Sequence, residues 1–255
     1  MRPVATRASD GGPGADADFP FRDGRPVAIG GSGWALLMAS VAVAFAALAL
    51  IPLRSFPGNL LPPLVFAGLP LLVLGVLVGR HWTALFRRVG WREVGVMALF
   101  AIATMAASLL AALVVRALDG VAPNPVTAAM MEMSAGAFVL RLLPTLPQLL
   151  GEEILTILPF LALLWFATQV LRLSRRAGIL VGLIGSSLIF AAVHLPTYDW
   201  HWAQCLGVIG TARVILTLAY IWTRNLWVST GAHVLNDWTE FSLAFGMSHV
   251  PIGTD

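Results

Sequence analysis

Acidic and histidine side chains occur in three stretches of this chain that are otherwise apolar. Two adjacent carboxylates come first, Glu152 and Glu153, followed by His194 and then by His233 with Asp237. A charged side chain at the centre of a bilayer costs roughly 2.5–3.5 kcal/mol on insertion scales, so such residues are rare in spanning helices and usually have a function. These five residues are therefore the candidate site.

The spacing of His233 and Asp237 indicates a shared face. Residues four apart lie on one side of a helix, so we expect the Asp237 carboxylate to orient the His233 imidazole, fix its tautomer and raise its basicity. Two histidines and an acidic pair on three separate helices can meet only in the core of a bundle. Together these residue types outline a hydrolytic site.

Hydrolysis of a peptide bond within lipid requires a water molecule, a base that activates it and donors that stabilise the oxyanion. A glutamate in such a site takes a proton from the water and later delivers it. The histidines have two alternative roles. They hold a metal such as zinc, or they donate hydrogen bonds to the oxyanion directly. Both alternatives fit the residue types.

The composition excludes an ordinary soluble protein. Hydrophobic residues make up 58% and charged residues 11%, and the mean hydropathy is +0.83, so there is too little polar surface to cover a soluble globule. We expect one all-α, polytopic transmembrane helix bundle of about seven spans over residues 34–250. The arginines have no interleaved aromatic pattern, so nucleic acid is not an expected partner. Cys205 is the single cysteine and cannot form an internal disulfide.

The predicted spans are apolar runs separated by short polar connections. Residues 1–33 contain many Gly, Pro and Asp and no apolar run, which predicts a disordered tail rather than a signal peptide. Between the third and fourth spans, Met130–Leu143 is expected to be an interfacial helix. The spans are residues 34–53, 60–79, 94–117, 149–171, 177–196, 205–222 and 226–246.

Arginines are concentrated in alternate loops. Because short cytoplasmic loops are enriched in Lys and Arg, we expect a cytoplasmic N-terminus and an external C-terminus, in an integral protein of a bacterial plasma membrane. The arginines concerned are Arg80, Arg87, Arg88, Arg92, Arg172, Arg175, Arg176 and Arg224.

Three short segments resemble, in order, the motifs EExxxR, FxxxH and HxxxN or HxxxD of the CPBP family, which comprises CAAX prenyl proteases and bacteriocin-processing enzymes and is also called Abi. The approach to the third motif, Tyr220–Trp227, is similar as well. The resemblance covers residues 149–240. The three segments are Gly151-Glu152-Glu153, Phe190-Ala191-Ala192-Val193-His194 and His233-Val234-Leu235-Asn236-Asp237.

The resemblance implies an intramembrane protease, an all-helical bundle with a cavity open to one side and to lipid. It assigns Glu152 as the base that activates water and Glu153 as a supporting carboxylate. His194 and His233 would bind the oxyanion, or a zinc ion if a metal is used, and Asp237 would position His233 or the water. The implied partners are the lipid bilayer and a membrane-embedded or membrane-associated peptide or protein substrate.

One position departs from the family pattern. The arginine of the first motif should stand at position 157, where this chain has Ile157. Arg213, within the sixth span, is the expected substitute, because an intramembrane arginine usually pairs with something. Its guanidinium should then lie within about 4–6 Å of Glu152 or Glu153. The alternative roles for Arg213 are snorkelling to the surface or a packing contact.

The predicted depths of these side chains in the membrane differ, so they could not meet if all the helices were straight. The predicted boundaries place Glu152 and His194 near the outer end, whereas His233 lies roughly 10 Å from the inner end. A kink at Pro159 or shifted helix boundaries would remove the conflict.

Three functions fit the residues. The first is an intramembrane endopeptidase. The second is a catalytically inactive family member that serves as a membrane scaffold or binding protein, which Ile157 motivates. The third is a proton-coupled transporter with a Glu, His and Asp relay. Inverted repeats and paired broken helices would favour transport, and the sequence shows neither.

Overall fold

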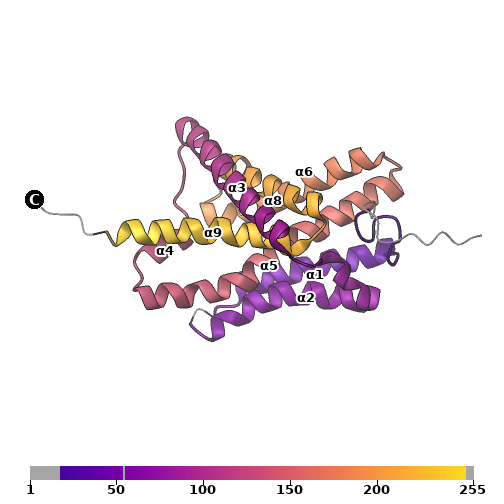
Figure 1. The fold of residues 1–255 in the computed structure, drawn as a ribbon, viewed down its shortest axis with the longest axis horizontal. Coiled ribbons are helices and arrows are strands. Elements are labelled where there is room, and N and C mark those ends of the chain that lie inside the picture. The colour runs from indigo at the N-terminus through magenta and orange to yellow at the C-terminus, as the bar shows by residue number, and fades with distance from the viewer. Residues whose placement is uncertain (1–17, 54, 251–255) are drawn as a thin grey trace, which may run out of the picture.

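The protein, described by a computed structural model over residues 18–53 and 55–250, folds into long helices packed side by side (Figure 1), and these residues contain no strand. Six helical segments within the described residues are long and apolar enough to cross a membrane. The predicted all-α transmembrane bundle is thus confirmed. The six segments are Gly31–Leu50, Gly58–Leu85, Trp91–Leu118, Ala135–Val170, Arg175–Val193 and Trp202–Thr223.

Most helix boundaries lie close to the predicted ones. The first three spans correspond, within three residues at each end, to α1 (Gly31–Leu50), α2 (Leu61–Val78) and α3 (Trp91–Leu118). The last helix, α9, has 23 residues and is long enough to span, but it carries several polar side chains and is not among the six apolar segments. The remaining helices of the second half are α6 (Arg175–Val193), α7 (Trp202–Gln204), α8 (Gly210–Thr223) and α9 (Leu226–Ser248).

The fourth span is longer than predicted. Helix α5 (Ala135–Trp165) begins at residue 135 rather than 149, and the short α4 (Pro125–Met131) precedes it. The predicted interfacial helix Met130–Leu143 is therefore wrong, because its first two residues end α4, the next three connect the helices, and the rest form the first turns of α5. The side chain of Ser134 caps this helix by accepting a hydrogen bond from the Ala137 backbone N–H at 3.4 Å.

Packing explains why the early turns of α5 are helical despite their prolines. Pro144 and Pro147 lie inside the helix, as neighbouring helices allow in membrane proteins. Phe138 of α5 stacks on Phe245 of α9 with ring centroids 4.4 Å apart, and Met130 and Phe241 are buried in the same cluster. The N-terminal part of α5 and the C-terminal part of α9 therefore support each other.

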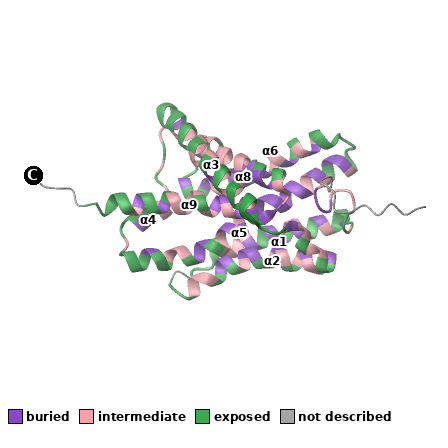
Figure 2. Ribbon diagram, viewed as in Figure 1, coloured by how far each residue is buried: buried purple, intermediate pink, exposed green. Residues whose placement is uncertain are grey.

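Helix α5 is the core of the bundle. In its most apolar window 67% of the residues are buried, against 17% for α3, and Figure 2 shows the buried residues concentrated along its middle. It packs against α6, α2, α9 and α1. Gly182 of α6 allows the two helices to approach closely, because a Cβ there would lie 2.9 Å from the Phe160 carbonyl oxygen. A polar residue in the middle of α5 is consequently in the protein interior.

The outer faces of the helices are apolar, as contact with lipid tails requires. Large hydrophobic side chains stand exposed along α2 and α3, which a soluble protein rarely shows over such an area. Examples are Leu72, Val76, Ile102, Leu109, Leu110 and Leu113.

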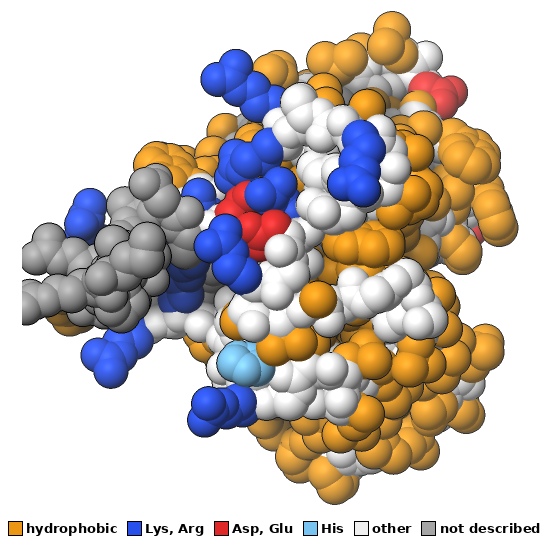
Figure 3. Space-filling model, turned by 90° about the vertical axis from the view of Figure 1, so that its right-hand side faces the viewer, with side chains coloured by type: hydrophobic (Ala, Val, Ile, Leu, Met, Phe, Trp, Pro, Cys, Tyr) orange, Lys and Arg blue, Asp and Glu red, His pale blue; other side chains and the backbone are white. Residues whose placement is uncertain are grey.

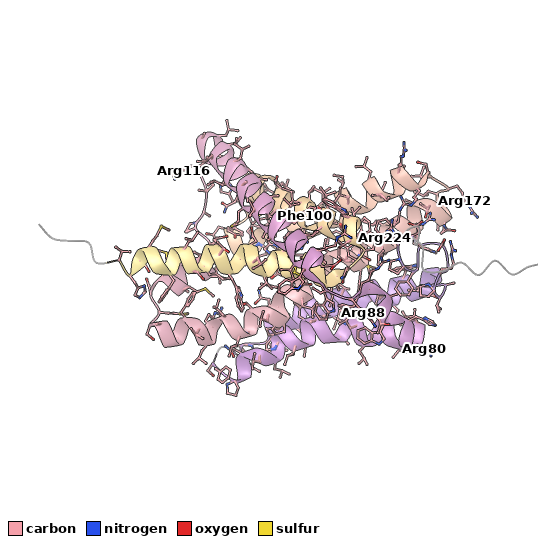
Figure 4. The ribbon with its side chains drawn as sticks, in the orientation of Figure 1. Arg80, Arg88, Phe100, Arg116, Arg172 and Arg224 are labelled. Atoms are coloured by element: carbon pink, nitrogen blue, oxygen red, sulfur yellow. The ribbon has the colours of Figure 1, made fainter. Side chains whose placement is uncertain are left out.

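Arginines gather at one end of the bundle. Arg80, Arg88, Arg172 and Arg224 lie toward the right-hand end in Figure 4, whereas Arg116 lies toward the opposite end. Figure 3 looks onto that right-hand end and shows basic side chains grouped there, with apolar side chains beside them. The two ends of the bundle thus differ in charge.

The segment before α1 packs against the bundle. Phe19 and Phe21 are buried, and the Phe19 ring meets the Phe160 ring edge-on at 5.3 Å. Asp18 accepts a hydrogen bond from Arg175 Nε at 3.0 Å. The predicted disordered tail is therefore wrong for residues 18–33. Two isolated aromatic side chains are buried against the bundle there, although the segment contains no apolar run that would predict it. Its first part, residues 1–17, lies outside the described residues.

Replacement of Phe19 tests this packing. Phe19→Ala should lower the free energy of unfolding by about 3–5 kcal/mol, because it removes a buried aromatic ring and leaves a cavity. Phe56→Ala is the matched control, since Phe56 is 50% exposed against 2% for Phe19. Unfolding in detergent, followed by circular dichroism, measures both. Equal stability of the two variants would mean that the segment contributes nothing to the fold.

Candidate functional site

The two glutamates lie in the middle of α5 rather than near its end. Because α5 begins at Ala135, Glu152 is about 26 Å along the helix at 1.5 Å per residue. His233 is seven residues after the first residue of α9, Leu226, and meets the glutamates there. The predicted depth conflict was a consequence of starting the fourth span too late, and the predicted position of Glu152 near the outer end is wrong.

Glu153 is the centre of a buried network. Its Oε1 accepts a hydrogen bond from Arg213 Nη1 at 2.7 Å and lies 2.9 Å from His233 Nδ1. The side chains of Glu153 and Arg213 are both fully buried. The predicted proximity of Arg213 to the acidic pair is thus confirmed, with Glu153 as the partner. Complete burial excludes snorkelling of Arg213 to the surface.

Phe190 covers the buried arginine. The Arg213 guanidinium carbon lies 5.0 Å from the centroid of the Phe190 ring, a distance at which the cation is attracted to the aromatic face. Phe190 belongs to α6, four residues before His194. Residues from all three motif segments therefore meet around Arg213, either directly or through Glu153.

The tautomer of His233 follows from its contact with Glu153. A carboxylate only accepts hydrogen bonds, so Nδ1 carries the hydrogen and Nε2 points away from Glu153. Nε2 lies 3.8 Å from Glu152 Oε2 and 3.6 Å from Asp237 Oδ1, both beyond direct hydrogen-bond distance. The expected approach of Asp237 to His233 is thus present at Nε2, and its role in positioning the ring or the water stays a prediction. Glu153 orients the ring through Nδ1, and Asp237 faces the opposite nitrogen.

Glu152 is held by a residue that the sequence did not single out. Its Oε1 accepts a hydrogen bond from Gln148 Nε2 at 3.0 Å, and its side chain is 13% exposed. Gln148 is four residues before Glu152 and so on the same helical face. That spacing could have revealed it, but the predicted span began at residue 149. Glu152 thus keeps one oxygen, Oε2, directed at His233.

His194 lies beside the other four residues without bonding to them. It is half-buried and ends α6, and its Nδ1 lies 2.7 Å from the Phe190 carbonyl oxygen. Its ring is 4.5 Å from the Phe190 ring, which in turn is 6.5 Å from the ring of His233. Within the described residues no hydrogen bond or ion pair joins His194 to Glu152, Glu153, His233 or Asp237. Four of the five predicted residues therefore lie in close contact through His233, whereas the close ring contact of His194 is with Phe190.

The described part of the chain contains no assembled metal site. No three His, Cys, Asp or Glu side chains among residues 18–53 and 55–250 are placed to share one ion, whereas catalytic zinc takes three protein ligands. The Nδ1 atoms of His194 and His233 already have partners, which leaves one nitrogen on each. Zinc held by His194 and His233 stays a prediction.

Comparison with known proteins adds no relative. No protein-family model, no curated protein and no solved structure matches this chain. The interpretation of the site accordingly depends on its geometry and on the three motif segments.

Proposed function

We propose that the protein is an intramembrane endopeptidase of the CPBP type, which hydrolyses a peptide bond with a water activated by Glu152. The observation that carries this proposal is that two carboxylate oxygens face the same imidazole nitrogen. Glu152 Oε2 and Asp237 Oδ1 lie 3.8 and 3.6 Å from His233 Nε2. The substrate is a membrane-embedded or membrane-associated peptide or protein.

Two carboxylate oxygens that face an accepting nitrogen need a donor near that nitrogen. The Nε2 atom of a neutral His233 accepts, as do both carboxylates, and polar atoms separated by more than about 3.5 Å are commonly bridged by water. A water supplies two O–H donors, and a doubly protonated imidazole is the other donor available. A water held here lies against Glu152, the group that would take its proton.

The proposed reaction has two proton transfers. Glu152 removes a proton from the water as its oxygen attacks the carbonyl carbon, and it then delivers that proton to the leaving amine as the carbon–nitrogen bond breaks. Between these steps a tetrahedral oxyanion requires donors. His194 and His233 can supply Nε2–H to it only when the ring carries both protons, because each Nδ1 already has an acceptor.

The main reason for considering an inactive scaffold no longer applies. It was based on Ile157, which leaves the acidic pair without the motif's cation. Arg213 supplies that cation to Glu153 from another helix, so the departure at position 157 no longer speaks against catalysis.

The charge difference between the ends supports the proposed orientation. The arginine-rich end, with Arg80, Arg88, Arg172 and Arg224, would face the cytoplasm of a bacterial cell. The segment that carries Phe19 and packs at this end would then be cytoplasmic, and the C-terminus of α9 would lie outside.

Cleavage of defined peptides tests the proposal. The purified protein is reconstituted in liposomes with a library of spanning and prenylated peptides, and products are identified by mass spectrometry. An endopeptidase gives paired fragments from one class of peptide. Binding of a peptide that stays intact would favour a scaffold, and would contradict the proposal.

Asp237 allows a graded test. Asp237→Asn should retain most activity, because it keeps an oxygen facing His233 Nε2 and the family motif accepts either residue. Asp237→Ala removes this oxygen and should reduce turnover roughly ten- to a hundredfold, because it removes an acceptor for the proposed water beside His233, and loss of such a supporting group commonly costs this much. Peptide cleavage rates measure the difference. Turnover by the Ala variant at the wild-type rate would reduce Asp237 to a packing role.

A further inference from the structure

Arg213 contacts Glu153 and Phe190 directly, and His233 through Glu153, from a helix outside the motifs. It lies in α8, is fully buried, donates Nη1 to Glu153 Oε1 at 2.7 Å and stacks on Phe190. The same Glu153 oxygen contacts His233 Nδ1 at 2.9 Å. The position of the His233 ring therefore depends on a carboxylate that Arg213 holds and neutralises.

The buried pair is poorly explained by stability. Arg213 Nε, Arg213 Nη2 and Glu153 Oε2 are buried and have no hydrogen-bond partner among the described residues. Unpaired buried polar atoms are costly, and apolar residues of similar volume often replace a buried ion pair without loss of stability. The pair is consequently better explained by what it does for His233 and Glu152.

Position 157, where the family motif has an arginine, identifies the cation that Arg213 would replace. Ile157 follows Glu153 by four residues on α5, and its side chain is fully buried. Residues with this spacing share a helical face, so an arginine at position 157 could reach the Glu153 carboxylate from the same helix. In this chain the cation reaches that carboxylate from α8 instead.

We propose that Arg213 is the positioning residue of the hydrolytic site: it holds Glu153 so that Glu153 fixes His233 with Nε2 toward Glu152. This inference rests on the proposed peptidase function. Removal of the guanidinium leaves Glu153 free to turn, and the ring then loses its fixed orientation. The rate of the chemical step should fall, while substrate affinity should stay nearly constant, because Arg213 is buried away from the substrate.

Four variants test this role. Arg213→Met should lower kcat at least tenfold with KM within about twofold of wild type. Arg213→Lys keeps the charge, so its kcat should lie between those of the wild type and Arg213→Met. Ile157→Arg in the Arg213→Met background returns a cation to Glu153 and should recover most of kcat. Arg176→Met, at an exposed arginine of α6, is the matched control and should behave as wild type.

Stability provides a readout that does not require catalysis. Arg213→Met alone should lower the melting temperature, because it leaves an uncompensated buried carboxylate. Adding Glu153→Gln removes that charge and keeps an acceptor for His233, so the double variant should melt higher than Arg213→Met. A double variant no more stable than Arg213→Met, or an Arg213→Met protein with wild-type kcat, overturns the inference. Absence of cleavage by the wild type, with the melting pattern intact, counts against the peptidase function and leaves the charge pairing standing.

Discussion

Replacement of Glu152 by glutamine should abolish hydrolysis while leaving the protein folded. Glutamine keeps the size of the side chain and an oxygen that can accept from Gln148, which contacts Glu152 Oε1 at 3.0 Å. It cannot take a proton from water at neutral pH, and loss of a general base typically costs 10²–10⁴-fold, so turnover should fall by at least about 100-fold. Cleavage in liposomes and the melting temperature measure the two effects.

Glu132→Gln is the matched control for this substitution. Glu132 is an exposed glutamate that follows α4, and its replacement should change neither turnover nor stability. Cleavage by Glu152→Gln at the wild-type rate would remove Glu152 from the role of base, even if the protein proved to be a peptidase.

Replacement of His233 should have the second large effect, and two substitutions separate its two nitrogens. His233→Asn places an amide N–H near the position of Nδ1, so it can still donate to Glu153, but it has no atom at Nε2. Turnover should fall by about 100-fold or more, because the group facing Glu152 and Asp237 is lost, with a small change in stability. His233→Ala loses both contacts and should also lower the melting temperature.

A histidine remote from the site controls for general effects on α9. His249 is exposed and ends this helix, so His249→Ala should retain wild-type turnover. Full activity of His233→Asn would show that Nε2 has no part in the reaction and would leave His233 with a structural role only.

The fold was largely predictable because a spanning helix must be long and apolar. α1, α2 and α3 lie close to the predicted runs, since lipid contact leaves little choice of residue along them. The start of α5 was not predictable from hydropathy, because Pro144 and Pro147 resemble loop residues, whereas in the fold they lie inside a helix that packs against α9. The burial of Phe19 and Phe21 depends likewise on a tertiary site that no local pattern reveals.

The residues that form the site could be predicted better than the contacts between them. Glu153, His233 and Arg213 stand out as polar residues in apolar helices, and their meeting follows from the need to compensate charge in the core. The contact of Glu153 with His233 Nδ1 was not predicted, because spacing along α9 says nothing about which carboxylate approaches from α5. Gln148 was missed for the same reason as the start of α5.

The proposed activity is cleavage of a peptide bond with water activated by Glu152. Cleavage in water enriched in ¹⁸O, followed by mass spectrometry of the fragments, tests it most directly. We predict one ¹⁸O atom in the new terminal carboxylate of the N-terminal fragment with wild-type protein, and no fragments with Glu152→Gln. Peptides that stay intact with folded wild-type protein, or fragments that carry no label, would contradict the account.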